Sequence, residues 1–136
     1  MATVLIVDDD LVLCDLYNAY FEVEGLTDWF ARGESDLDVA LEAIAADNPA
    51  IIFLDNRLPP YQDFIEPLKM IKDSGFTGPI VVQSACIEDD IFNRAKDLGA
   101  TMVQEKWQVS SESLAKTISQ LSTTGMDKHS GRSGEI

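Results

Sequence analysis

Three carboxylates, a hydroxyl and an amine stand at the ends of short strand-like runs in the sequence. Asp8 and Asp9 follow Val-Leu-Ile-Val, and Asp55 follows Ile-Ile-Phe-Leu. Ser84 and Lys106 come after two later runs of the same kind. The carboxyl ends of parallel strands meet at one edge of a sheet, where open α/β folds bind their ligands. We therefore expect these five side chains to gather in one site.

The charges of such a site predict its chemistry. Carboxylates this close cannot all stay ionised without compensation, and Mg²⁺ takes oxygen ligands from one or two carboxylates together with phosphate oxygens. A carboxylate beside that ion is a nucleophile toward phosphorus. Lys106 would then pair with a phosphoryl oxygen, and Ser84 would offer a hydroxyl donor at the same rim. The residues indicate Mg²⁺-assisted phosphoryl transfer.

Each group also has an ordinary structural interpretation. Acids are favoured at helix N-termini, so the run 8–10 taken alone fits a helix start equally well. Asp55 alone could cap the turn before the two prolines that follow it. Ser84 could bond backbone, and Lys106 could be a solvated surface lysine. The coincidence of acid, acid, hydroxyl and amine at four strand ends favours a shared site.

Five strand-like runs alternate with five segments of helical periodicity. The strands are predicted at 4–7, 27–31, 51–55, 79–83 and 101–104. Apolar residues recur at helical spacing over 13–20, 37–44, 64–71, 91–98 and 114–121. Ser35 and Asp38 form a predicted capping box for the second of these helices. Ser110 or Ser111 is the predicted N-cap of the last helix. Such alternation predicts an α/β, doubly wound, five-stranded parallel sheet of flavodoxin-like order 2-1-3-4-5 with five helices. Its switch point lies between the strands that end at Asp8 and Asp55.

Length and charge limit the function classes. The 136 residues suit one domain, which we place at 1–122. The segment 123–136 is polar, rich in Gly and Ser and without periodicity, which predicts a disordered tail. The net charge of −14 argues against direct nucleic acid binding and favours a divalent cation or a basic partner face. No apolar run reaches the roughly 20 residues of a membrane span. With no signal peptide and with Cys14 and Cys86 as free thiols, we expect a cytoplasmic protein.

Four motifs taken together resemble the receiver domain of two-component response regulators over residues 3–122. They are Val-Leu-Ile-Val-Asp8-Asp9-Asp10, Phe-Leu-Asp55-Asn-Arg-Leu58-Pro59, Val-Val-Gln-Ser84-Ala85, and Gly99-Ala100 followed by Lys106. The resemblance implies a stand-alone, single-domain regulator whose Asp55 accepts a phosphoryl group from a histidine kinase or a phosphotransfer protein. It implies that Mg²⁺ is held by Asp8, Asp9, Asp55 and the backbone carbonyl of Arg57, and that Ser84, Ala85 and Lys106 form the phosphoryl-contacting switch.

Two positions depart from the family pattern. Receivers usually carry Tyr or Phe three residues before the lysine and Pro directly after it, whereas this chain has Val103 and Trp107. Val103 and Trp107 are therefore the candidate readout positions. The resemblance implies that the signal leaves through the face formed by the fourth helix, the fifth strand and the fifth helix, which would bind a downstream protein.

Two other functions stay open from the sequence alone. A degenerate receiver would bind partners without phosphorylation, which the residues at 103 and 107 favour. A phosphatase of the haloacid dehalogenase type would use Asp8 as nucleophile and Asp10 as acid/base. The phosphatase interpretation leaves Asp55 without a role and lacks an acidic pair after Lys106.

Overall fold

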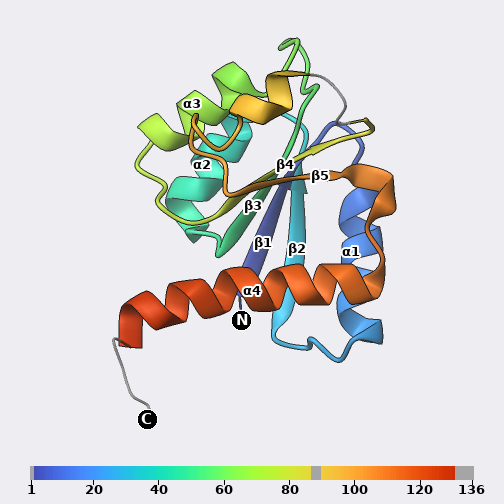
Figure 1. Cartoon of the computed structure of the whole chain (residues 1–136). Helices are drawn as coiled ribbons and strands as arrows, with labels where there is room; N and C mark the ends of the chain where they lie inside the picture. Colours follow the sequence, from blue (N-terminus) through green and yellow to red (C-terminus); the bar gives the residue numbers. More distant parts are fainter. Residues whose placement is uncertain (1, 87–89, 131–136) are drawn as a thin grey trace.

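One parallel sheet of five strands forms the centre of the molecule, in the order β2-β1-β3-β4-β5 (Figure 1). The structure, a computed structural model, describes residues 2–86 and 90–130, with side chains as far as Ser122 in the last helix. The strands are β1 (Ala2–Val7), β2 (Trp29–Glu34), β3 (Ile51–Asp55), β4 (Ile80–Ser84) and β5 (Met102–Glu105). The predicted doubly wound topology is confirmed.

Helices cover both faces of the sheet. The α-helices are α1 (Val12–Val23), α2 (Leu37–Asp47), α3 (Ile65–Asp73) and α4 (Ser111–Ser130), and the 3₁₀ helices are η1 (Asp90–Arg94) and η2 (Lys106–Gln108). The helices α1 and α4 lie on one face of the sheet, and α2, α3 and η1 lie on the other (Figure 1). Apolar side chains of α1 and α4 form one core, and those of α2, α3 and η1 form a second core. No helix among the described residues is long and apolar enough to cross a bilayer.

The central strand β3 is buried along its whole length. Its side chains alternate between the two cores, with Phe53 facing α1 and Leu54 facing α3. A strand covered on both faces reads as a continuous apolar run, which is why the sequence predicts it within the same bounds. Asp55 ends this run and is still only 6% exposed. The sheet therefore places one carboxylate rigidly at its carboxyl edge.

The C-terminal end of β2 and the N-cap of α2 both lie further along the chain than predicted. β2 runs to Glu34 because it pairs with β1 along its full length, from Ala2↔Trp29 to Val7↔Glu34. The extra residues are polar and belong to an edge strand, so the apolar pattern does not reveal them. The N-cap of α2 is consequently Asp36, whose side chain accepts from the Val39 N–H at 3.1 Å, and the capping box predicted at Ser35 is wrong by one residue.

The segment predicted as a helix over 91–98 forms the 3₁₀ helix η1 followed by turns. Its two buried side chains, Phe92 and Ala95, are three residues apart, which is the period of a 3₁₀ helix. The Ala95 N–H donates to the Phe92 carbonyl at 3.2 Å in keeping with that spacing. Gly99 ends the segment with a φ of +111°.

The last helix begins as predicted and continues further than predicted. Ser110 Oγ accepts from the Ser113 N–H at 3.1 Å and so caps α4. Its apolar stripe ends at Leu121, yet the backbone stays helical to Ser130, because no proline interrupts the propagation of a helix already nucleated. The disordered tail predicted at 123–136 stays a prediction, and residues 131–136 lie outside the described part of the chain.

Candidate phosphoryl-acceptor site

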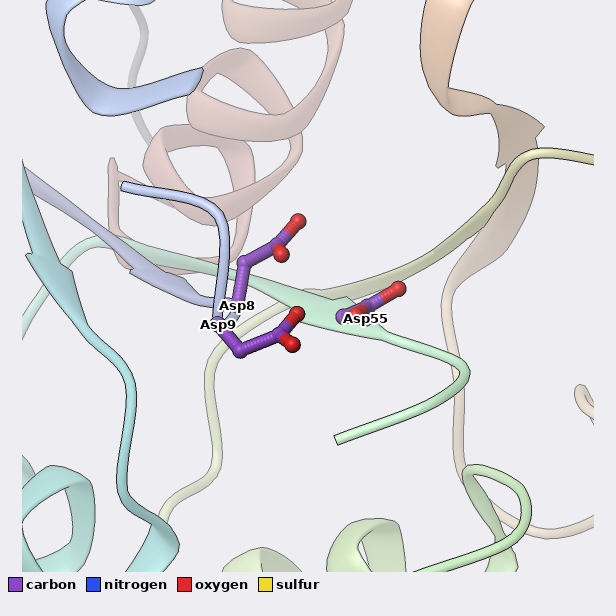
Figure 2. Close-up of side chains that lie close together, drawn as sticks. All are labelled: Asp8, Asp9 and Asp55. Atoms are coloured by element: carbon purple, nitrogen blue, oxygen red, sulfur yellow. The ribbon is translucent and has the colours of Figure 1, made fainter. Parts of the chain in front are cut away.

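The three predicted carboxylates converge at the carboxyl edge of the sheet. β1 and β3 pair in register as far as Val7↔Leu54, so the residues that follow stand side by side. One carboxylate oxygen from each of Asp8, Asp9 and Asp55 lies within 4.8 Å of the other two (Figure 2). Asp8 is fully buried, whereas Asp9 is exposed. This all-oxygen donor set fits a hard divalent cation such as Mg²⁺.

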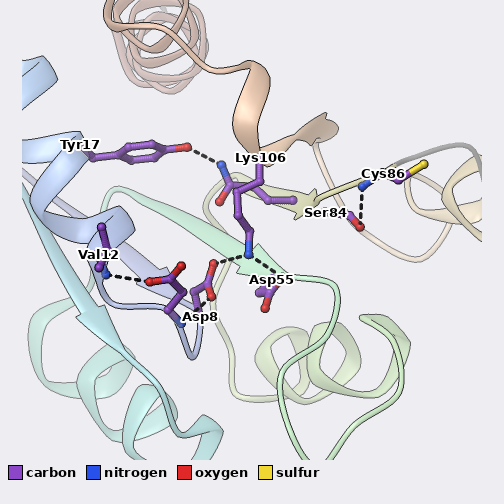
Figure 3. Close-up of polar contacts among 9 residues, drawn as sticks. Asp8, Val12, Tyr17, Asp55, Ser84, Cys86 and Lys106 are labelled. Carbon is purple, nitrogen blue, oxygen red and sulfur yellow. Dashed lines mark hydrogen bonds and ion pairs between the residues drawn. The ribbon is translucent and has the colours of Figure 1, made fainter.

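The third acid of the triplet has a structural role. Asp10 Oδ1 accepts from the Val12 N–H at 3.1 Å, at the start of α1. The Asp10 N–H in turn donates to Asp8 Oδ1 at 2.8 Å and so holds the Asp8 carboxylate (Figure 3). The helix-start interpretation therefore applies to Asp10, while Asp8 and Asp9 line the site.

Lys106 joins two of these carboxylates. Its Nζ lies 2.7 Å from Asp8 Oδ2 and 3.1 Å from Asp55 Oδ1, and its side chain is 9% exposed (Figure 3). Burial alone would lower the pKa of Lys106, but its hydrogen bond to Asp8 and the charge of Asp55 outweigh burial and raise that pKa. Lys106 is therefore a fixed cation at neutral pH.

Several neighbours shift the pKa of the Asp8 carboxyl in opposite directions. Burial raises its pKa and the neighbouring charge of Asp55 adds to the rise, while the hydrogen bonds from Lys106 and Asp10 oppose it. The net direction is upward. One ammonium faces two buried carboxylates with Asp9 beside them, so the site carries an excess of negative charge that suits a cation.

A cavity of about 550 Å³ opens beside Asp55. Its lining includes Asn56, Arg57, Ser84, Ala85, Cys86 and Phe92. Ser84 lies at the end of β4 with its Oγ accepting from the Cys86 N–H at 3.4 Å (Figure 3). The predicted switch residues 84 and 85 therefore border the same space as the Asp55 carboxylate.

The two candidate readout residues lie in different surroundings. Val103 is half-buried and lines a second cavity of about 470 Å³ with Phe92, Asn93, Lys96 and Met102. Trp107 is 57% exposed, and its ring centroid is 5.9 Å from Lys106 Nζ. Their part in any readout stays a prediction.

A buried polar group beneath the site was not predicted. Gln83 Nε2 donates to the Tyr17 hydroxyl between β4 and α1. Among the described residues, Gln83 Oε1 is buried without a hydrogen-bond partner. Gln83 and Gln104 are register partners on neighbouring strands. The available signal was a glutamine near the end of each of two otherwise apolar runs.

The comparison with protein families decides the classification. The model of the response regulator receiver domain matches residues 4–119. The chain belongs to this family. Receivers are signalling domains, and this membership removes the support for the phosphatase alternative.

Solved structures with the same fold include several receivers. A signal receiver domain from Vibrio parahaemolyticus, described as that of a Luxo repressor protein, superposes with a TM-score of 0.78 at 21% identity, over 93% of this chain and 95% of that one. The receiver domain of Francisella response regulator 1452 gives 0.76 at 22% identity, over 92% and 99%. The BeF₃-activated receiver domain of Klebsiella pneumoniae RstA gives 0.69 at 24% identity, over 88% and 97%. No curated protein matches the sequence.

Proposed function

We propose that this receiver accepts a phosphoryl group on Asp55 in a Mg²⁺-dependent reaction and thereby controls a protein-binding surface. The observation that carries the proposal is the convergence of the Asp8, Asp9 and Asp55 oxygens within 4.8 Å, beside a buried lysine. The donor would be a phosphohistidine of a histidine kinase or of a phosphotransfer protein. The regulator would act as a stand-alone domain in the cytoplasm, where free Cys14 and Cys86 persist.

The chain's own residues have definite tasks in this transfer. An oxygen of the Asp55 carboxylate attacks phosphorus as the P–N bond of the donor breaks, and the imidazole leaves with the bonding electron pair. Asp8, Asp9, Asp55 and the Arg57 carbonyl would hold Mg²⁺, which supplies charge neutralisation to the transferred group. Lys106 would keep one contact with Asp8 and turn toward a phosphoryl oxygen. Ser84 would leave its bond with the Cys86 N–H and donate its hydroxyl to another phosphoryl oxygen.

The outgoing surface would consist of η1, β5 and α4, which correspond to the fourth helix, fifth strand and fifth helix of the sequence prediction. Phosphorylation would shift a two-state equilibrium by drawing Ser84 and its loop inward. The exposed Trp107 ring adjoins this surface and is suited to contact a downstream protein. The net charge of −14 makes nucleic acid an unsuitable direct partner.

The test is a phosphorylation assay read by intact mass. Incubation with Mg²⁺ and acetyl phosphate should add one phosphoryl group to the wild-type chain and none to Asp55→Asn. Asp73→Asn, which removes an exposed acid at the C-terminal end of α3, is the matched control and should be phosphorylated normally. A wild-type chain that binds Mg²⁺ and never gains mass would contradict the proposal and would favour constitutive partner binding.

A further inference from the structure

The loop that joins β3 to α3 runs through residues 56–64 at the rim of the acceptor cavity. It carries Arg57, whose backbone carbonyl is a proposed Mg²⁺ ligand. Leu58 anchors the loop in the core with no exposed surface, and the Tyr61 N–H donates to the Leu58 carbonyl at 2.8 Å. The position of the Arg57 carbonyl therefore depends on how the two ends of this loop are held.

Asn56 holds both ends. Its backbone N–H donates to the Gln83 carbonyl on β4 at 2.7 Å, which fixes the start of the loop to the sheet. Its Oδ1 accepts from the Phe64 N–H at 3.1 Å, across eight residues of chain. Phe64 directly precedes α3, so this N–H has no partner within the helix. Both residues are buried, so the Phe64 N–H would have little access to another acceptor if the Asn56 side chain were removed.

We propose that Asn56 is a positioning residue that fixes the Arg57 carbonyl and so gives the metal site its preference for Mg²⁺ over Ca²⁺. This inference rests on the proposed function. Mg²⁺ demands near-ideal octahedral geometry at about 2.0–2.1 Å, whereas Ca²⁺ accepts irregular ligand arrangements at about 2.3–2.6 Å. A ligand that is free to move therefore weakens Mg²⁺ binding more than Ca²⁺ binding. Groups that orient a ligand typically contribute about 10- to 100-fold in metal affinity.

The ratio of the two affinities separates positioning from stability. If the Asn56–Phe64 hydrogen bond only stabilised the fold, its loss would weaken the binding of both cations equally or change neither affinity. Asn56→Leu removes the acceptor while keeping the size of the side chain. Asn56→Asp restores an acceptor oxygen and serves as the conservative rescue. Its added charge strengthens the binding of both cations and leaves their ratio close to that of the wild type.

Isothermal titration calorimetry with MgCl₂ and with CaCl₂, on the unphosphorylated full chain, measures the ratio directly. In Asn56→Leu, Mg²⁺ should bind about tenfold more weakly. The affinity for Ca²⁺ should change by less than about threefold, because Ca²⁺ tolerates a displaced carbonyl ligand. Asn18→Leu is the matched control, since Asn18 also bonds the backbone through its side chain, at Ala31, but ties α1 to β2. That variant should keep the wild-type ratio.

An unchanged ratio in Asn56→Leu, or an equal loss in Asn18→Leu, would overturn the inference. Should Asn56→Leu fail to fold, Asn56→Ala is measured in its place with the same expected change of ratio. Failure of the proposed function gives a different result, because a wild-type chain without Mg²⁺ affinity refutes both ideas. A wild-type chain that binds Mg²⁺ and is phosphorylated, with an unaltered ratio in Asn56→Leu, refutes only the role of Asn56.

Discussion

Lys106 holds two buried carboxylates together before any cation arrives. Its Nζ contacts both Asp8 and Asp55, and none of the three side chains is more than 9% exposed. Removing one partner of a buried ion pair leaves the other charge uncompensated, which is a larger loss than the pair's net contribution to stability. The stability of the domain without metal should therefore depend on this one amine.

Replacing Lys106 with Met tests that dependence by urea unfolding with and without Mg²⁺. Without metal, the free energy of unfolding should fall by about 3 kcal/mol, because two carboxylates then repel each other in a buried site. Mg²⁺ should restore more stability to Lys106→Met than it adds to the wild type. Lys69→Met, at an exposed position, is the control. Equal metal-free stability of Lys106→Met and wild type would refute the argument.

Residue types at strand ends predicted that Asp8, Asp9 and Asp55 lie together, because the carboxyl ends of parallel strands meet at one edge of a sheet. Their roles in phosphoryl transfer stay a prediction. The contacts of Asn56 and Gln83 were not predictable in this way. Asn56 acts through Phe64, and Gln83 acts through Tyr17, 66 residues earlier in the chain. The sequence shows Gln83 only as a polar residue near the end of an apolar run. The partners of both residues are set when the chain folds, so no local pattern identifies them.

At the scale of the element, the N-cap of α2 is Asp36, whereas the sequence pattern predicts Ser35. Asp36 has an extended backbone, and its side chain accepts the Val39 N–H. Asp36→Ala should lower the free energy of unfolding by about 1 kcal/mol, because an N–H of the first turn loses its partner. Ser35→Ala should leave it within about 0.5 kcal/mol of wild type. Thermal unfolding of both variants measures the two losses of stability. A larger loss in Ser35→Ala than in Asp36→Ala would identify Ser35 as the N-cap.

The elements that were predicted best are those whose burial is uniform. β3 is covered on both sides, so its bounds follow from composition alone. β2 is an edge strand whose last residues, Arg32 and Glu34, form a surface ion pair at 2.9 Å, and its extent depends on β1 rather than on its own residues. η1 buries only a narrow stripe, and its tertiary contacts decide between α and 3₁₀ geometry.

At the scale of the whole molecule, the buried hydroxyl of Tyr17 makes the free energy of unfolding depend on pH in the alkaline range. Burial raises the pKa of Tyr17 far above its ordinary value near 10, although its hydrogen bond from Gln83 acts in the opposite direction. The unfolded chain loses this proton near pH 10 and the folded chain keeps it. Stability is therefore fully present below pH 10 and declines as the pH rises beyond it.

Tyr17→Phe should remove this part of the pH dependence. One proton corresponds to about 1.4 kcal/mol of unfolding free energy per pH unit. Denaturant unfolding between pH 9 and 11 should therefore show a shallower decline in Tyr17→Phe than in wild type. Tyr20→Phe, which removes a half-buried hydroxyl from the same helix, is the comparison. Identical slopes for wild type and Tyr17→Phe would rule out Tyr17 as the source.

The ring of Phe92 borders both cavities, the one beside Asp55 and the one beside Val103. It also stacks on Phe64, with ring centroids 5.7 Å apart, at the end of the loop that Asn56 closes. One aromatic side chain thus forms part of the wall of both cavities. We expect a rotation of the Phe92 ring to change the shape of both cavities at once, so that a molecule bound in one would alter the room available in the other.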